Sequence, residues 1–215
     1  MRQYLYFILT LLHTPLVIAQ IQTGFWRGTL ETPGGPLPFN FTFTEKDSQY
    51  LFVLHNGDES LATDTVIVTG EYIHIQLAVF HATLQAKILE NGNQLSGEFQ
   101  DYSRGDNYII PFKATAGQSF RFFKTHANAV ADISGKWATQ FYSDTDSSFA
   151  IGVFTQNGNA LEGTFLTETG DYRFLEGDVT GNQFFLSAFD GSHAFLFTGE
   201  ILNDSLLQGR FFSGT

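Results

Sequence analysis

Five polar residues in two turns of the C-terminal half have the residue types that could do chemistry. They are Asp171, Arg173, Asp190, Ser192 and His193. An aspartate, a serine and a histidine could form a nucleophilic triad, but a triad is defined by its geometry, and three of these residues are neighbours in one turn. The sequence also has no Gly-x-Ser-x-Gly elbow to expose a nucleophilic serine. We therefore predict that the chain has no catalytic residue.

A structural or contact role explains these five residues better. Asp171 follows a glycine, and aspartate at such positions bonds to the local backbone. Arg173 could pair with Glu162 or Glu176, and a surface pair of this kind contributes only about 0–1 kcal/mol. Turns separated by two strands lie at the same end of a meander. We therefore expect the turns at 170–171 and 190–192 to place these side chains in one cluster at a rim.

The composition and residue spacing give little support for redox chemistry, metal binding, glycoside hydrolysis or nucleic-acid binding. The chain has no cysteine, so it has no thiolate for redox chemistry or metal binding. The histidines show no H-x-H or H-x-x-x-H spacing, and no spacing selects a carboxylate pair for glycoside hydrolysis. A net charge of −11 opposes binding to nucleic acid. We predict no metal site, no cofactor and no nucleic-acid partner.

The elements that carry these residues are predicted to be β-strands. Short runs of alternating apolar and polar residues recur between turn signals, and no helical period is sustained. In the clearest run, Phe39, Phe41 and Phe43 alternate with Asn40 and Thr42, which is typical of a half-buried strand. The strands expected in the first half are Gly24–Leu30, Pro38–Thr44, Tyr50–Leu54, Thr65–Thr69, Tyr72–Leu77, Thr83–Ile88, Leu95–Asp101 and Tyr108–Ala114.

The connections between strands are short and carry hairpin signals. Asn56-Gly57 and Asn91-Gly92 are dipeptides that favour type I′ hairpin turns. The segment Lys124–Ile133 has no strand pattern, and it is either one helical turn or a linker. The fold class predicted from these patterns is an antiparallel all-β meander.

The second half repeats the first at an offset of about 110 residues. Trp137 follows Trp26 by 111 residues, and Gly209 follows Gly97 by 112. We predict two similar halves, near 24–122 and 135–212, within one β domain that spans 20–215. Two such meanders could form one closed barrel, two packed sheets or two small barrels.

Two strands of the second half are apolar on both faces. They are Phe184–Ala188 and Ala194–Thr198. A strand of this kind must be covered on both sides. The cover could come from another layer of this chain or from a domain that the sequence does not contain.

The N-terminus has the pattern of a secretory signal. Arg2 precedes the apolar run Tyr4–Leu12, and small residues end the segment at Ala19. The run is well short of the ~20 residues that a membrane span requires. We expect residues 1–19 to be removed, no membrane span to remain, and the mature chain to lie in the periplasm or cell envelope.

Residues 135–214 resemble a known family. The runs TGDYRFLEG and FDGSHAFLF are similar to the β region that precedes the thioredoxin fold in exported TlpA-like redoxins of Bacteroidota-type bacteria. GFWRGTL and LPFNF extend the resemblance into the first half. In that family a thioredoxin domain with a Cys-x-x-Cys motif follows, and the present chain ends at Thr215 without cysteine, so no catalytic residue is carried over.

The resemblance implies a non-catalytic accessory or interaction domain that contacts a thioredoxin-fold domain or protein. Whether the chain is a fragment, a truncated product or a stand-alone relative stays open. The alternative is a lipocalin-like barrel that holds a small apolar ligand. A large cavity lined by phenylalanine would favour the ligand binder. A filled interior with an exposed apolar patch would favour docking.

Overall fold

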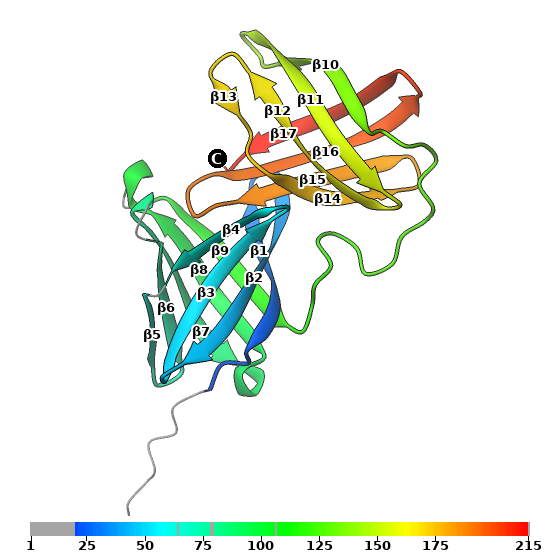
Figure 1. Ribbon diagram of the computed structural model, residues 1–215. Coiled ribbons are helices and arrows are strands. Elements are labelled where there is room, and N and C mark those ends of the chain that lie inside the picture. Colours follow the sequence, from blue (N-terminus) through cyan, green and yellow to red (C-terminus); the bar gives the residue numbers. More distant parts are fainter. Residues whose placement is uncertain (1–19, 64, 78–79, 106, 215) are drawn as a thin grey trace, which may run out of the picture.

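The computed structural model describes residues 20–214 except residues 64, 78–79 and 106. Two antiparallel sheets follow one another along the chain, one in each half, and Figure 1 shows the second above the first. The described residues contain no α-helix, and none of their helices is long and apolar enough to cross a membrane. The expected secretory signal lies outside the described residues.

The first half is a nearly closed barrel of nine strands. Each strand pairs with the strands before and after it in the chain, except that β4 and β5 do not pair with each other. Because β1 also pairs with β9, the sheet has a single break, between β4 and β5. The strands are β1 (Gly24–Thr32), β2 (Gly35–Lys46), β3 (Gln49–Asn56), β4 (Glu59–Thr63), β5 (Val66–Thr69), β6 (Tyr72–Leu77), β7 (Ala82–Leu89), β8 (Gln94–Asp101) and β9 (Ile109–Ala116).

The second half is a half-barrel of eight strands. Its order is β10-β11-β12-β14-β15-β16-β17, with the short β13 beside β12, and no pair joins β10 to β17. The strands are β10 (Gly135–Tyr142), β11 (Ser147–Asn157), β12 (Ala160–Thr167), β13 (Gly170–Asp171), β14 (Leu175–Thr180), β15 (Gln183–Phe189), β16 (Ala194–Asn203) and β17 (Leu206–Ser213). The predicted antiparallel all-β class and the two similar halves are confirmed, and the arrangement is one nearly closed barrel and one half-barrel.

The hairpins differ from the sequence prediction in two details. Asn56 pairs with Glu59, so the tight turn consists of Gly57 and Asp58, one residue later than predicted. Asn91 lies in a short 3-10 turn, Glu90–Gly92, inside a four-residue connection between Leu89 and Gln94. The prediction of a two-residue hairpin there was wrong. Asn91 has φ of 53° and Gly92 has φ of 88°, so the dipeptide does supply the positive φ values that the connection needs.

The alternation predicted for β2 is confirmed by its burial. Phe39, Phe41 and Phe43 are fully buried inside the first barrel, where their rings lie 5.4 to 5.8 Å apart along the strand. Rings from the neighbouring strands fill the rest of the interior, including those of Trp26, Phe52, Phe99 and Phe112. The first barrel therefore has a packed core rather than a ligand cavity.

The repeat extends to individual hydrogen bonds. The indole Nε1 of Trp26 donates to the Gln22 carbonyl at 2.8 Å, and Nε1 of Trp137 donates to the Ile133 carbonyl at 2.8 Å. In both halves the acceptor lies four residues before the tryptophan. This shared detail places β10 as the counterpart of β1, and the matching glycines Gly97 and Gly209 place β17 as the counterpart of β8.

The strands that are apolar on both faces are covered by this chain itself. Phe184 and Leu186 of β15 face the core of the second half, whereas Phe189 enters the core of the first barrel. The ring of Phe189 lies 4.7 Å from Phe39 and 5.0 Å from Phe99. Residues 117–134 run as a linker without regular structure. The expectation that a separate domain could cover these strands is therefore not needed for the described residues.

Candidate functional site

The turn residues singled out in the sequence lie where the two halves meet. Asp190 is 3% exposed, and its Oδ2 lies 3.2 Å from Nε of Arg173 and 2.9 Å from Nδ1 of His193. Its Oδ1 accepts hydrogen bonds from the backbone N–H groups of Ser192 and His193, at 2.9 and 2.8 Å. The structure thus brings four of the five residues into contact around one buried carboxylate.

The partners of Arg173 differ from those expected. The guanidinium pairs with Glu59 of the first half and with Asp190, rather than with Glu162 or Glu176. Glu59 lies on β4, an edge strand whose mixed sequence, ESLAT, gave no strand signal. Asp171 is exposed, and its Oδ1 accepts a hydrogen bond from the Arg173 N–H at 3.0 Å. Asp171 therefore fixes the backbone at Arg173, where φ is 59°.

These contacts assign the turn residues to the junction between the halves. Ser192 Oγ donates to Oδ2 of Asp101, at 3.4 Å, and the ring of His193 lies 6.3 Å from that of Phe80. Both Asp101 and Phe80 belong to the first half. Ser192 bonds to Asp101 and His193 to Asp190. These contacts do not connect the serine to the histidine as a nucleophile is connected to its base.

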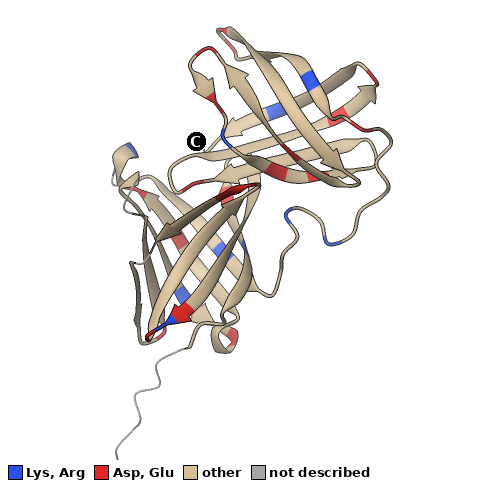
Figure 2. Ribbon diagram, viewed as in Figure 1, with Lys and Arg blue, Asp and Glu red and all other residues tan. Residues whose placement is uncertain are grey.

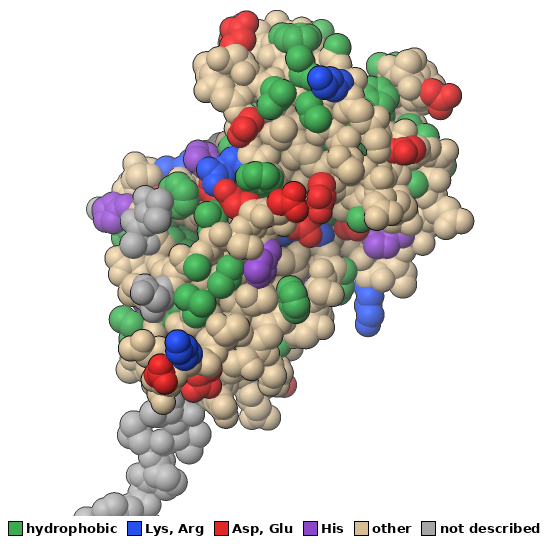
Figure 3. Space-filling model, viewed as in Figure 1, with side chains coloured by type: hydrophobic (Ala, Val, Ile, Leu, Met, Phe, Trp, Pro, Cys, Tyr) green, Lys and Arg blue, Asp and Glu red, His purple; other side chains and the backbone are tan. Residues whose placement is uncertain are grey.

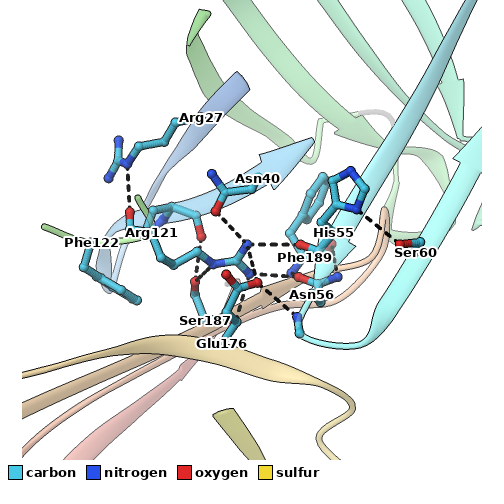
Figure 4. A network of polar contacts seen from close by, with 12 residues as sticks. Arg27, Asn40, His55, Asn56, Ser60, Arg121, Phe122, Glu176, Ser187 and Phe189 are labelled. Atoms are coloured by element: carbon cyan, nitrogen blue, oxygen red, sulfur yellow. Dashed lines mark hydrogen bonds and ion pairs between the residues drawn. The ribbon is translucent and has the colours of Figure 1, made fainter. Parts of the chain in front are cut away.

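A second polar cluster at the junction centres on Arg121, which the sequence patterns did not single out. Arg121 lies in the linker and is 3% exposed. Figure 4 shows its guanidinium between the halves, surrounded by acceptors from both. It donates to the His55 carbonyl at 3.1 Å in the first half and to the Ser187 carbonyl at 3.1 Å in the second.

Side chains complete the shell around this guanidinium. Arg121 donates to Oδ1 of Asn56 at 2.9 Å and to Oγ of Ser187 at 3.0 Å, and Oε2 of Glu176 lies 3.6 Å away. Burial lowers the pKa of Arg121, and the Glu176 carboxylate opposes that shift. The Ser187 hydroxyl also donates a hydrogen bond to the Pro38 carbonyl in the first half, at 2.6 Å. The cluster joins three segments of the chain, and its residues serve to hold the halves together.

The linker adds a further contact on the outer face of the half-barrel. The Phe122 N–H and the His126 ring both bond to the Asp178 carboxylate, at 2.9 and 2.8 Å. The ring of Phe185 lies 5.5 Å from that of Phe122 and 5.0 Å from that of Phe123. These aromatic residues cover the side of β15 that the core of the second half leaves open.

Acidic residues gather beside the junction. Figure 2 shows acidic positions at the facing ends of the two sheets, and Figure 3 shows a patch of acidic side chains between the halves. Burial raises the pKa of Glu162, and the nearby carboxylates of Asp58 and Glu176 raise it further. In the described part of the chain, no three His, Asp or Glu side chains are grouped to hold a metal ion.

The half-barrel has a groove on its surface. It runs between β10 and β17 and has a volume of about 550 Å³. We call it the aromatic groove. Its walls and floor include Trp137, Thr139, Phe141, Phe154, Phe165, Phe197, Leu207, Arg210 and Phe211. The rings of Phe141 and Phe211 meet across it with their centroids 5.8 Å apart.

The repeat explains why this groove exists. In the first half, β9 lies between β1 and β8 and pairs with both. Their counterparts β10 and β17 have no described strand between them. Trp26 and Phe99 are fully buried, whereas the corresponding Trp137 and Phe211 are only partly buried. The groove therefore occupies the position that a ninth strand fills in the first barrel.

Comparisons with known proteins add no identification. Neither a protein-family model, nor a curated protein, nor a solved structure matches the chain. The resemblance to exported redoxins therefore stays a prediction from the quoted sequence runs.

Sequence reasoning reached the turn cluster but missed the groove and Arg121. The turn residues could be placed because their strands are adjacent in the chain and their spacing sets which end of the sheet they share. Arg121 is separated from Asn56 and Ser187 by 65 and 66 residues, so no local pattern reports its burial. A sign of the groove was present in the alignment of the two halves, because β9 of the first half has no counterpart among the described residues of the second.

Proposed function

We propose that this protein is a non-catalytic interaction module whose recognition site is the aromatic groove. The observation that carries this proposal is the position of β10 and β17. They are the two edge strands of the sheet, each paired on one side only, and they lie on either side of an open surface lined with aromatic residues. Exposed strand edges present backbone donors and acceptors to a partner, and aromatic side chains supply apolar contact area. The turn cluster and the Arg121 cluster hold the half-barrel in a fixed position for that role.

The partner expected from the sequence resemblance is a thioredoxin-fold domain or protein in the cell envelope. Support for docking at the strands that are apolar on both faces has weakened, because the linker and the first barrel cover them. The aromatic groove is lined by residues of the second half alone, and neither the linker nor the first barrel contributes to its lining. On this proposal the chain contributes binding and positioning, and any thiol chemistry resides in the partner.

Site-specific cross-linking tests the proposal. Because the chain has no cysteine, Thr139→Cys carries a photo-activated cross-linker inside the groove, and Ile67→Cys carries it on the first barrel, where Ile67 is 55% exposed. In the native cell envelope we expect one discrete protein adduct from position 139 that position 67 does not give. The adduct must then be reproduced with the purified partner. Equal adducts from both positions, or none from position 139, would overturn the proposal.

A small apolar ligand is the second candidate, and the lining of the groove favours it. A volume of about 550 Å³ lies within the range of roughly 300–1,000 Å³ typical of ligand pockets. Native mass spectrometry of the purified protein tests this candidate, since a bound lipid or aromatic compound adds a defined mass that organic extraction removes. A protein at its sequence mass, with no shift in melting temperature on adding fatty acids, would contradict it.

A further inference from the structure

We infer that the partner binds the aromatic groove as a β-strand, antiparallel to both β10 and β17, and so completes the second barrel. This inference rests on the proposed interaction function and names the chemistry of its partner. The occupant to which we commit is an extended segment of another protein, with apolar side chains at alternate positions. Addition of a strand to a sheet edge is a general mode of peptide recognition, in which backbone bonds supply affinity and side-chain pockets supply specificity.

The first half shows how such a segment would be held. There β9 pairs with β1 through Trp26↔Ala116 and Leu30↔Phe112, and with β8 through Gly97↔Phe112. Because β1 and β8 are each antiparallel to β9, they run in the same direction as one another. The repeat gives β10 and β17 the same relation, so a single strand can pair with both edges at once.

The repeat also sets the register of the occupant. Phe141 and Gly209 correspond to Leu30 and Gly97, so they should face a large apolar residue, as Phe112 does in the first half. Trp137 corresponds to Trp26, which pairs with Ala116, so a small residue should face Trp137. The expected pattern is therefore large-x-small-x-small along the segment.

The two strands on either side of the groove add a charge preference. Lys136 is the one charged residue of β10, and Arg210 is the one charged residue of β17. Both are exposed, although the protein as a whole has a net charge of −11. A segment with an acidic side chain among its outward-facing positions is favoured over one with lysine or arginine there.

Binding of a synthetic peptide to residues 20–215 tests the inference. The probe has the sequence of residues 108–117, which contains β9, with the outward-facing Lys113 changed by Lys113→Glu. The control peptide has the same change and carries serine at the inward positions of Ile110, Phe112 and Ala114. A second probe carries Phe112→Val. Its smaller side chain fits if the ring of Phe141 leaves too little room for a phenylalanine at that position. We expect at least one probe to bind at least tenfold more tightly than the control peptide, with a blue shift of the Trp137 fluorescence. Trp26 is fully buried and should not respond.

Two protein variants and one further measurement complete the test. Thr139→Glu places a charge inside the groove and should weaken the probe at least tenfold, whereas Gln49→Glu, at an exposed position of the first barrel, should change binding less than twofold. Hydrogen exchange of the complex should slow in both β10 and β17. Such protection separates strand addition from side-chain binding alone.

Each remaining outcome overturns the inference. These outcomes are no binding of either probe, equal binding of the control peptide, and binding without slowed exchange in β10 and β17. Concentration-dependent protection of β10 without peptide would assign the groove to a second copy of this chain. The proposed interaction function is tested separately by the cross-linking experiment. An adduct from position 139 does not require the partner to bind as a strand.

Discussion

Arg121 is a charged side chain held almost without solvent between two halves of a protein. Its hydrogen-bond acceptors are the carbonyl groups of His55 and Ser187 and the side chains of Asn40, Asn56 and Ser187, and the Glu176 carboxylate is its ion-pair partner. Removing the guanidinium leaves buried acceptors such as Asn56 Oδ1 and the Ser187 carbonyl without a donor, which costs about 1–3 kcal/mol. Arg121→Ala should therefore lower the free energy of unfolding by an amount in that range.

Urea unfolding followed by circular dichroism measures this effect. Lys124→Ala is the matched control, because Lys124 lies in the same linker and is exposed. It should change the stability by less than about 0.5 kcal/mol. An Arg121→Ala variant as stable as the Lys124→Ala variant would show that the guanidinium does not join the halves.

Glu162 should make the protein less stable as the pH rises. Burial, Asp58 and Glu176 raise its pKa in the folded state, so the folded protein holds this proton more tightly than the unfolded chain does. The stabilisation is fully present below the ordinary pKa of glutamate and is lost as the pH rises through the raised pKa of the folded state. Glu162→Gln should remove this dependence and be slightly more stable than the parent at neutral pH.

Thermal unfolding between pH 4 and pH 7, at low and at high salt, checks the effect of Glu162. Added salt should shrink the difference between parent and variant, because it screens the repulsion from Asp58 and Glu176. A variant that is less stable than the parent at neutral pH would contradict the assignment.

His193 tests whether the turn cluster is structural. Its side chain is partly exposed and bonds to Asp190, and exposed pairs of this kind contribute about 0–1 kcal/mol. His193→Ala should therefore cost about 1 kcal/mol or less and leave no enzymatic rate to lose. Hydrolysis of ester, glycoside or peptide substrates by the parent protein, abolished in the variant, would refute the non-catalytic assignment.

At the scale of single elements, the paired glycines of the repeat have a steric reason. A Cβ atom on Gly97 would overlap the carbonyl oxygen of Gln85 on the neighbouring strand, and one on Gly209 would overlap that of Thr198. Gly97→Ala should therefore force β7 and β8 apart and cost at least about 1–3 kcal/mol. Ser96→Ala, one residue earlier in β8, is the control. Equal melting temperatures for the two variants would contradict this account.

The sequence predicts an element well when its burial follows local periodicity. Phe39, Phe41 and Phe43 were placed correctly because alternation is a property of the strand itself. The strand Glu59–Thr63 was missed, since its residues are mixed in polarity and its pairing depends on β3. The contacts of Phe189 and Arg121 could not be predicted, because they depend on how one half sits on the other.

At the scale of the whole molecule, the two similar halves differ in how far their barrels are closed. The first has a strand between the counterparts of β10 and β17, and its interior is filled. The second lacks that strand among its described residues, and its aromatic interior opens into the groove. The proposed function depends on this difference between the halves.

Hydrogen exchange of the free protein in its monomeric state measures that difference most directly. Amides of β1 from Trp26 to Leu30 and of β8 from Gln94 to Gln100, which have partner strands on both sides, should all exchange slowly. Amides of β10 and β17 should alternate, with those directed to β11 or β16 slow and those directed into the groove fast. Uniformly slow exchange in β10 and β17, equal to that in β1 and β8, would mean that the groove is already closed and would contradict the account.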